Sequence, residues 1–223
     1  MASVTEVARK AKQPYGGFIK PSQFTKIALT KEEELSAKEN LSPATIGMVV
    51  DYMSRYMMNG DVIKAFEISY RGAMYARLLG YDKAVDVAEG LLKRIKGLDD
   101  ESIISACKAT TYDVWYRNPL MSEGAKKAID TNPNEETIEN IRVMVKRSLT
   151  FFEKYGPIVK DGFTFDGGYS KTVDAGDGDF LTKDTLWDFK VSKNNLTSKH
   201  TLQLLMYWIM GRHSKQSIFN SIE

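Results

Sequence analysis

The sequence contains a single cysteine and no long hydrophobic run. Cys107 has no second cysteine with which to form a disulfide, a zinc site or an iron–sulfur cluster, which fits a reducing compartment. No apolar run approaches the roughly 20 residues that span a membrane, and Met1 to Lys12 lacks the apolar core of a signal peptide. We therefore expect a cytoplasmic protein with no membrane partner.

Charge of one sign is also lacking, since the formal net charge of the 223 residues is only +2. Hydrophobic residues make up 43% and charged residues 27%, which is typical of a globular protein and excludes disordered and fibrous classes. A balanced total neither requires nor forbids a polyanionic partner, because local patches govern phosphate binding. The small positive excess lies in the first 155 residues, so we expect this section to help hold any bound nucleic acid.

Strand-like alternation is scarce in residues 1–155, where apolar residues recur at three- and four-residue spacing. Capping side chains mark several helix starts, and glycine or proline marks the ends. We expect helices from Ser42 to Met58, from Asp61 to Gly80, from Asp82 to near Gly97, from Asp99 or Asp100 to Tyr112, and from about Glu135. This helical section is a candidate surface for nucleic acid or for a protein partner.

The pattern changes at Tyr155-Gly156-Pro157, where proline and glycine end the helix and short β-branched and aromatic runs follow. We place a domain boundary here, with 1–155 helical and 156–223 containing the sheet, which begins between Gly162 and Tyr169. The expected elements are strands at Phe163–Phe165, Asp179–Thr182 and Thr185–Ser192, a hairpin turn at Lys183-Asp184, and a helix from Lys199 to Met210. The fold class is therefore α+β.

The chemically informative residues lie in the expected hairpin. Side chains two apart on a strand share a face, so Asp188 and Lys190 point one way while Trp187, Phe189 and Val191 point into a core. Asp179 starts the neighbouring strand, and the short turn brings its carboxylate towards that of Asp188.

Two convergent carboxylates oppose each other's ionisation, and a divalent cation removes that cost. Hard oxygen ligands suit Mg²⁺ or Mn²⁺, which can activate a water and neutralise charge on a phosphate. Lys190 would steady the water or the developing negative charge. The set of residues predicts a phosphodiester hydrolysis site. It also predicts that Asp188→Asn relieves repulsion and leaves the metal-free protein at least as stable.

Asp179 followed by Asp188-Phe189-Lys190 resembles the core of the PD-(D/E)XK nuclease superfamily. Gln203 and Tyr207, four residues apart on the next helix, resemble the QxxxY motif of its RecB-like branch. The resemblance covers about 163–211. It implies a mixed sheet flanked by helices, a metal held by Asp179, Asp188 and the backbone carbonyl of Phe189, and a catalytic Lys190. It further implies that Gln203 and Tyr207 face the metal and the substrate, which in this branch is mostly DNA, cut at ends or in single strands.

Three departures from the family pattern bear on this interpretation. Gly178 stands where the family usually has proline, the usual upstream ligand has only Glu67 and Glu153 as candidates, and a late strand is missing unless Ser217 to Ile222 supplies it. The sequence therefore predicts a Mg²⁺-dependent deoxyribonuclease. The alternative is a catalytically weak or inactive protein of nuclease fold that binds nucleic acid or a protein partner as a regulator or inhibitor.

Overall fold

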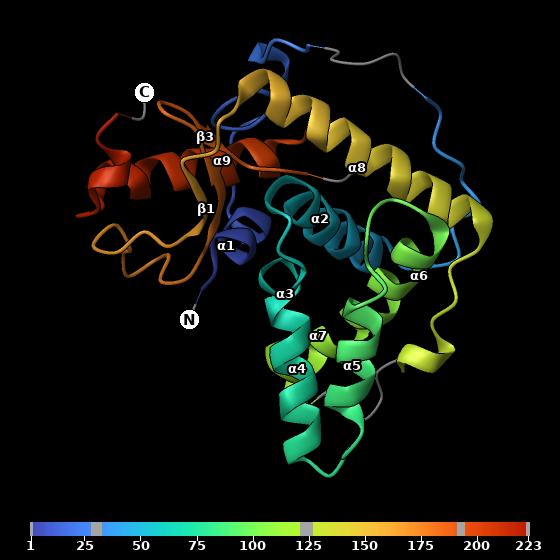
Figure 1. Ribbon diagram of the computed structural model, residues 1–223. Helices are drawn as coiled ribbons and strands as arrows, with labels where there is room; N and C mark the ends of the chain where they lie inside the picture. Colours follow the sequence, from blue (N-terminus) through green and yellow to red (C-terminus); the bar gives the residue numbers. More distant parts are fainter. Residues whose placement is uncertain (1, 28–32, 121–126, 191–194, 222–223) are drawn as a thin grey trace. The chain divides into compact units, whose positions relative to one another are not determined.

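A computed structural model of the chain describes residues 2–27, 33–120, 127–190 and 195–221 (Figure 1). It is an α+β protein that divides into two compact units. The sheet unit consists of Met1–Ala28 and Phe151–Glu223, and the helical unit is Leu29–Thr150. The boundary predicted from the sequence places the first 28 residues in the helical section, whereas the structure groups them with the sheet.

The helical unit contains no strand among its described residues, as the sequence predicts. Its α-helices are α2 (Pro43–Asn59), α3 (Val62–Ala65), α4 (Glu67–Leu78), α5 (Ala84–Leu92), α6 (Asp100–Ala109), α7 (Asp113–Arg117) and most of α8 (Glu135–Tyr155), and its 3-10 turns include η2 (Thr110–Tyr112) and η4 (Ala128–Asp130). No helix of the described residues is long and apolar enough to cross a membrane.

Local capping explains where these helices begin and end. The Ser42 side chain accepts a hydrogen bond from the Thr45 N–H, and α2 ends at Gly60, whose φ of 70° is left-handed. Asp61 caps α3, but the expected helix to Gly80 is broken at Phe66, whose side chain is fully buried. The expected helix to Gly97 is shorter, since α5 ends at Leu92.

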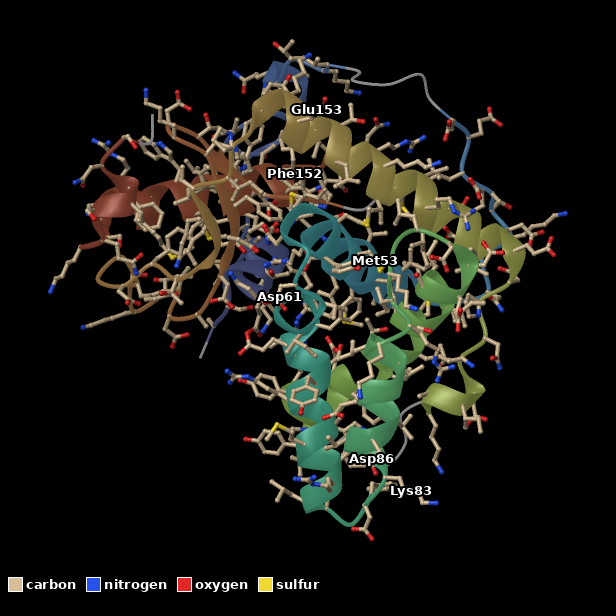
Figure 2. All side chains as sticks on the ribbon, viewed as in Figure 1. Met53, Asp61, Lys83, Asp86, Phe152 and Glu153 are labelled. Carbon is tan, nitrogen blue, oxygen red and sulfur yellow. The ribbon has the colours of Figure 1, made fainter. Side chains whose placement is uncertain are left out.

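The core of the helical unit is built from α2, α6 and α8. Met53, Ile103 and Ile141 are fully buried there (Figure 2 labels Met53). Cys107 lies in the same cluster, and burial raises the pKa of its thiol to about 12. The lone cysteine is therefore a packing residue, since an apolar environment disfavours the reactive thiolate.

The sheet unit contains three antiparallel strands in the order β1 (Lys160–Phe163), β2 (Gly178–Leu181) and β3 (Leu186–Trp187). Phe180 pairs with Trp187, so the expected hairpin is confirmed. The strand expected at 163–165 lies earlier in the chain, and β3 is shorter than expected because the ladder ends before Asp188. The resemblance implies a mixed sheet, but in the described residues the only parallel pairing is an isolated bridge between Ser3 and Ala175.

Helices complete the sheet unit. They are α1 (Val4–Lys10), α9 (Ser198–His213) and the 3-10 turns η1 (Pro21–Gln23) and η5 (Ser217–Phe219). The segment 217–222, which was the candidate for the family's late strand, forms a 3-10 turn over its first three residues, and position 222 lies outside the described residues.

The N-terminal helix α1 contributes to the core of the sheet unit. Val4 donates its N–H to the Ala175 carbonyl at 2.9 Å, and its side chain is fully buried. Phe165 stacks between Tyr207 and Phe219, with ring centroids 5.4 Å from each. The contacts of Ser3 and Val4 with Ala175 explain why the first residues group with the C-terminal section. Periodicity alone did not reveal a helix of only 7 residues.

Candidate active site

The β2–β3 hairpin brings the two sequence-predicted carboxylates into one region. Asp179 lies in β2, and Asp188 directly follows β3. Asp179 Oδ2 accepts a hydrogen bond of 2.7 Å from the backbone N–H of Phe189. This bond fixes the Asp179 carboxylate against the backbone next to Asp188 and beyond the end of the strand ladder.

Aromatic packing holds the segment that carries Asp188. The Phe189 ring stacks on Phe152 at 5.5 Å and 15°, and Trp187 meets Phe151 edge-on at 4.8 Å. Trp187 and Phe189 therefore point to the end of α8, as strand alternation predicts, whereas Val191 lies outside the described residues. The anchored rings fix the backbone that presents Asp188 and Lys190.

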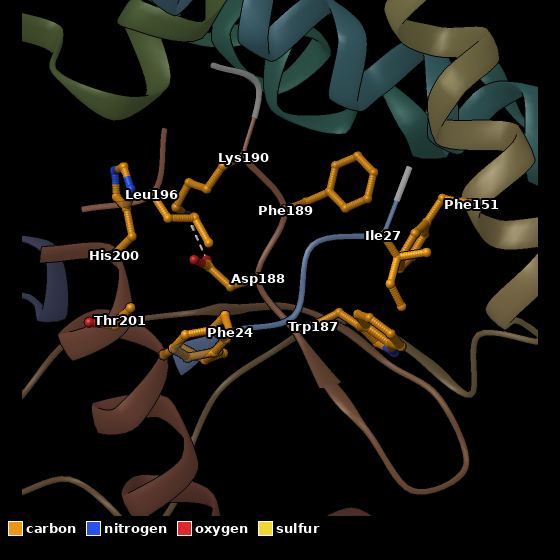
Figure 3. A pocket seen from close by; sticks show the side chains of 11 residues that line it. Phe24, Ile27, Phe151, Trp187, Asp188, Phe189, Lys190, Leu196, His200 and Thr201 are labelled. Carbon is orange, nitrogen blue, oxygen red and sulfur yellow. Dashed lines mark hydrogen bonds and ion pairs between the residues drawn. The ribbon is translucent and has the colours of Figure 1, made fainter. Parts of the chain in front are cut away.

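Asp188 and Lys190 form an ion pair, with 2.6 Å between Lys190 Nζ and Asp188 Oδ1 (Figure 3). The Asp188 side chain is only 7% exposed and that of Lys190 is 32% exposed. Strand alternation predicts that the two side chains share a face, and the ion pair agrees with that prediction.

The ion pair changes the expected effect of neutralising Asp188. The sequence leaves two outcomes open: repulsion from Asp179, which neutralisation would relieve, or pairing with Lys190, which neutralisation would break. In the structure Asp188 has Lys190 as its cation partner, and Asp179 accepts the Phe189 N–H. Breaking a partly buried pair leaves a charge without its partner, and this cost opposes the relief of repulsion. We therefore replace the expectation of equal or higher stability with a modest loss.

Gln203 and Tyr207 form a buried polar pair one turn apart on α9. Gln203 Nε2 donates to the Tyr207 hydroxyl at 3.1 Å, and the two residues are 8% and 4% exposed. Burial, together with the charges of Asp188, Asp179 and Asp177, raises the pKa of Tyr207 to about 12, while the hydrogen bond with Gln203 opposes part of this rise. The hydroxyl end of Tyr207 thus lies within electrostatic reach of the carboxylates, while its ring belongs to the core.

Asp177 is not among the site residues predicted from the sequence. It is exposed in the segment before β2, yet its charge acts on the same tyrosine hydroxyl as those of Asp179 and Asp188. The signal available in the sequence was its two-residue spacing from Asp179, which places both carboxylates near one strand end.

A cavity of about 540 Å³ adjoins the Asp188–Lys190 pair (Figure 3). Its lining residues come from the N-terminal segment, the end of α8, the β3 segment and the first turns of α9: Phe24, Ile27, Phe151, Trp187, Asp188, Phe189, Lys190, Leu196, His200, Thr201 and Leu204. The N-terminal members could not be predicted from the sequence, because nothing in the pattern indicates that residues near the start of the chain return to the hairpin.

The available donors for a divalent cation are the carboxylates of Asp179 and Asp188 and the carbonyl of Phe189. These are hard oxygen ligands of the kind that Mg²⁺ prefers. Glu153 is exposed on α8, and Glu67 belongs to the helical unit, where it pairs with Arg71 at 2.5 Å. In the part of the chain that the structure describes, no three His, Cys, Asp or Glu residues form a metal-holding group. A cation held here would therefore keep several waters, as Mg²⁺ commonly does.

Gly178 departs from the family pattern for a steric reason. A Cβ at this position would lie 2.2 Å from ring atoms of Phe163, to which Gly178 is paired in the sheet. Proline or any other side chain would therefore displace that buried ring, so glycine is required where the resemblance implies proline.

Comparison of the chain with protein-family models, with curated proteins and with solved structures gives no match.

Proposed function

We propose that the protein is a metal-dependent nuclease that hydrolyses phosphodiester bonds in DNA. The observation that carries the proposal is the hydrogen bond from Phe189 N–H to Asp179 Oδ2, made beside the Asp188–Lys190 ion pair. Two carboxylates and a lysine are thereby gathered at the end of one hairpin. A carboxylate pair with a neighbouring cation suits a reaction in which negative charge accumulates on phosphate oxygens.

Asp179, Asp188 and the Phe189 carbonyl would hold Mg²⁺ or Mn²⁺. When bound, such a cation supplies a water of lowered pKa and neutralises charge on the phosphate. The 2.7 Å bond from Phe189 to Asp179 orients that carboxylate before any ligand arrives. Preorganisation of this kind avoids an entropic cost at the moment of reaction.

Lys190 is the group proposed to act directly on the reacting phosphate. Its ammonium is held 2.6 Å from Asp188, and its side chain keeps 32% exposure, so it can turn from the carboxylate to a phosphate oxygen without leaving the site. Its positive charge would stabilise the negative charge that develops on the phosphate oxygens.

Gln203 and Tyr207 are proposed as positioning residues. Gln203 donates a hydrogen bond to Tyr207, and both residues are buried. The charges of three carboxylates contribute to the raised pKa of Tyr207. We propose that the pair supports the arrangement of Asp179 and Asp188. Membership of the PD-(D/E)XK superfamily and its RecB-like branch is part of this proposal, supported by the order of Asp179, Asp188, Lys190, Gln203 and Tyr207 along a hairpin and the next helix.

A second candidate function is regulatory binding of nucleic acid or a protein without efficient cleavage. One observation favours it: across the described ranges, no third acidic or histidine side chain joins the two aspartates in a metal-holding group. A protein with the hairpin but a weak metal site would bind phosphates and cut poorly.

Cleavage assays separate the two candidates. Plasmid and single-stranded circular DNA are incubated with the protein in Mg²⁺, in Mn²⁺ and in EDTA. The proposal expects metal-dependent cutting, loss of cutting in EDTA, and strong loss in Lys190→Gln, which keeps both carboxylates. Binding of DNA with no cutting in either metal would favour the regulatory alternative instead.

A further inference from the structure

The walls of the cavity beside Asp188 and Lys190 are rich in aromatic and aliphatic groups. Phe24, Trp187 and Phe189 contribute rings, and Leu196 and Leu204 contribute aliphatic surface. Its volume of about 540 Å³ lies within the range of pockets that bury a small planar molecule. Such walls favour a flat, largely apolar ligand that can stack.

Hydrogen bonds hold the N-terminal wall of the cavity in place. Thr201 donates its hydroxyl to the Ile19 carbonyl at 2.6 Å, which ties the segment to α9. Farther along the segment, Lys26 Nζ donates to Asn195 Oδ1 at 3.3 Å. Phe24 lies between these two anchors, so its 36% exposed ring is a fixed part of the cavity.

The polar groups of the cavity suit a ligand that carries a phosphate. The backbone N–H of Thr197 donates to His200 Nδ1 at 3.2 Å. Because this bond requires a lone pair on Nδ1, the neutral ring carries its proton on Nε2 and can donate it. Lys190 adds a positive charge on the same lining.

We propose that this cavity binds an unpaired nucleobase of the DNA strand whose phosphate lies at Asp188 and Lys190. The inference rests on the proposed function, because Asp188, Phe189 and Lys190 belong both to the cavity lining and to the proposed phosphodiester site. A base linked to that phosphate is the planar group that chemistry places next to it. Stacking on aromatic rings accepts any base, so the cavity would not select a sequence.

A base pocket restricts the state of the DNA that can bind. A base inside a duplex is stacked on both sides and paired at its edge, so it can enter a pocket only after leaving the helix. Single strands and frayed ends offer such bases without that cost, in agreement with the substrates that the resemblance implies. What the cavity adds is the wall that receives the base, to which the N-terminal segment contributes Phe24.

The test measures binding of a short single strand whose only base is one 2-aminopurine. Every other position is abasic, so that no other base can occupy the cavity, and EDTA prevents metal-dependent cutting. Stacking of this base on a ring quenches its fluorescence. Phe24→Ala removes a wall ring, and Phe18→Ala is the matched control, because Phe18 is 58% exposed in the same segment and does not line the cavity. We expect quenching in the wild type and in Phe18→Ala, and its loss with about tenfold weaker binding in Phe24→Ala, the size expected for one stacked base.

A strand that is abasic at every position supplies a second measurement on folded wild-type protein. This fully abasic strand should bind the wild type as weakly as the 2-aminopurine strand binds Phe24→Ala. Equal quenching and equal affinity in Phe24→Ala and Phe18→Ala would overturn the base pocket, and so would equal binding of intact duplex and single strand. If metal-dependent cutting persists in that case, the base pocket alone fails. If the base binds through Phe24 but no metal supports cutting, the proposed function fails and the base pocket stands.

Discussion

Neutralising Asp188 separates its role as a metal ligand from its role as an ion-pair partner. Asp188→Asn keeps the shape of the side chain and removes its charge. Among the described residues, Lys190 at 2.6 Å is a favourable neighbour of this charge, and Asp179, which the Phe189 N–H holds at the adjacent backbone, is an unfavourable one. The two effects on stability have opposite signs, so their sizes decide the result.

The stability effect is small and destabilising. A hydrogen bond to a charged group contributes about 1.5–3 kcal/mol, and Lys190 lies at the low end because its 32% exposed side chain can regain water. Relief of repulsion from Asp179 offsets part of this loss. The net cost in EDTA should be about 1 kcal/mol, which lowers Tm by about 2–4 °C for a protein of this size.

The assay follows thermal unfolding of three proteins in EDTA and in Mg²⁺. Wild-type protein should gain about 2.7 kcal/mol when Mg²⁺ is at 100 times its Kd, since only the folded state binds it. Asp188→Asn should lose this gain together with cleavage. Lys190→Met is the matched control: it breaks the same ion pair and keeps both carboxylates, and therefore the Mg²⁺-induced gain. It should cost more stability in EDTA than Asp188→Asn, because it leaves the buried Asp188 charge without its partner while Asp179 still repels it.

The reasoning would be refuted by a Mg²⁺-induced rise of Tm that is the same in Asp188→Asn and wild type. Asp188 would then be a scaffold carboxylate that serves only to pair with Lys190. A loss of the rise in both variants would show that the ion pair itself, rather than ligation by Asp188, supports metal binding.

Three further predictions concern the buried polar groups and caps. Tyr207→Phe should destabilise the protein by about 1 kcal/mol, since it leaves the buried Gln203 amide without its partner, and a Gln203→Leu/Tyr207→Phe double mutant should recover part of that loss in chemical denaturation. Asp99→Ala should lower the free energy of unfolding by about 1 kcal/mol at neutral pH, because it removes the cap of α6. The Ser102 N–H and hydroxyl hold the pKa of Asp99 below its usual value, so the stabilisation by the Asp99 charge is present above pH 3.8 and is lost as pH falls through the lowered pKa. Urea titrations at several pH values check this dependence. Cys107 should react with iodoacetamide at pH 8 only as fast as the protein unfolds, because burial raises its pKa to about 12; rapid labelling of folded protein would contradict its packing role.

The elements that could be predicted from the sequence are those with local signals. The helix after Ser42 is marked by a capping hydroxyl, a first-turn proline and a terminal glycine, all of which act within a few residues. The hairpin at Lys183-Asp184 is likewise local, and the register Phe180 to Trp187 follows from its short turn. Such signals need no knowledge of the rest of the fold.

The features that could not be predicted depend on tertiary packing. The break at Phe66 reflects burial of one ring in a core built from distant helices. Phe24 joins the cavity because Thr201 binds the Ile19 carbonyl across 182 positions of sequence. Strand alternation predicts that Asp188 and Lys190 share a face, but whether pairing with Lys190 or repulsion from Asp179 dominates depends on distances and burial that only the folded chain sets.

Cleavage of an end-labelled single strand by wild type and by Asp179→Asn, purified in parallel, tests the central claim most directly. Asp179 is the proposed ligand that the Phe189 N–H holds in place, and Asn keeps its shape without its charge. The account predicts Mg²⁺-dependent product from the wild type, none in EDTA, and at least a hundredfold slower product formation by Asp179→Asn, on the order of the loss expected for a metal-ligand environment. Equal cleavage by the two proteins, or no cleavage by the wild type in Mg²⁺ or Mn²⁺, would contradict it.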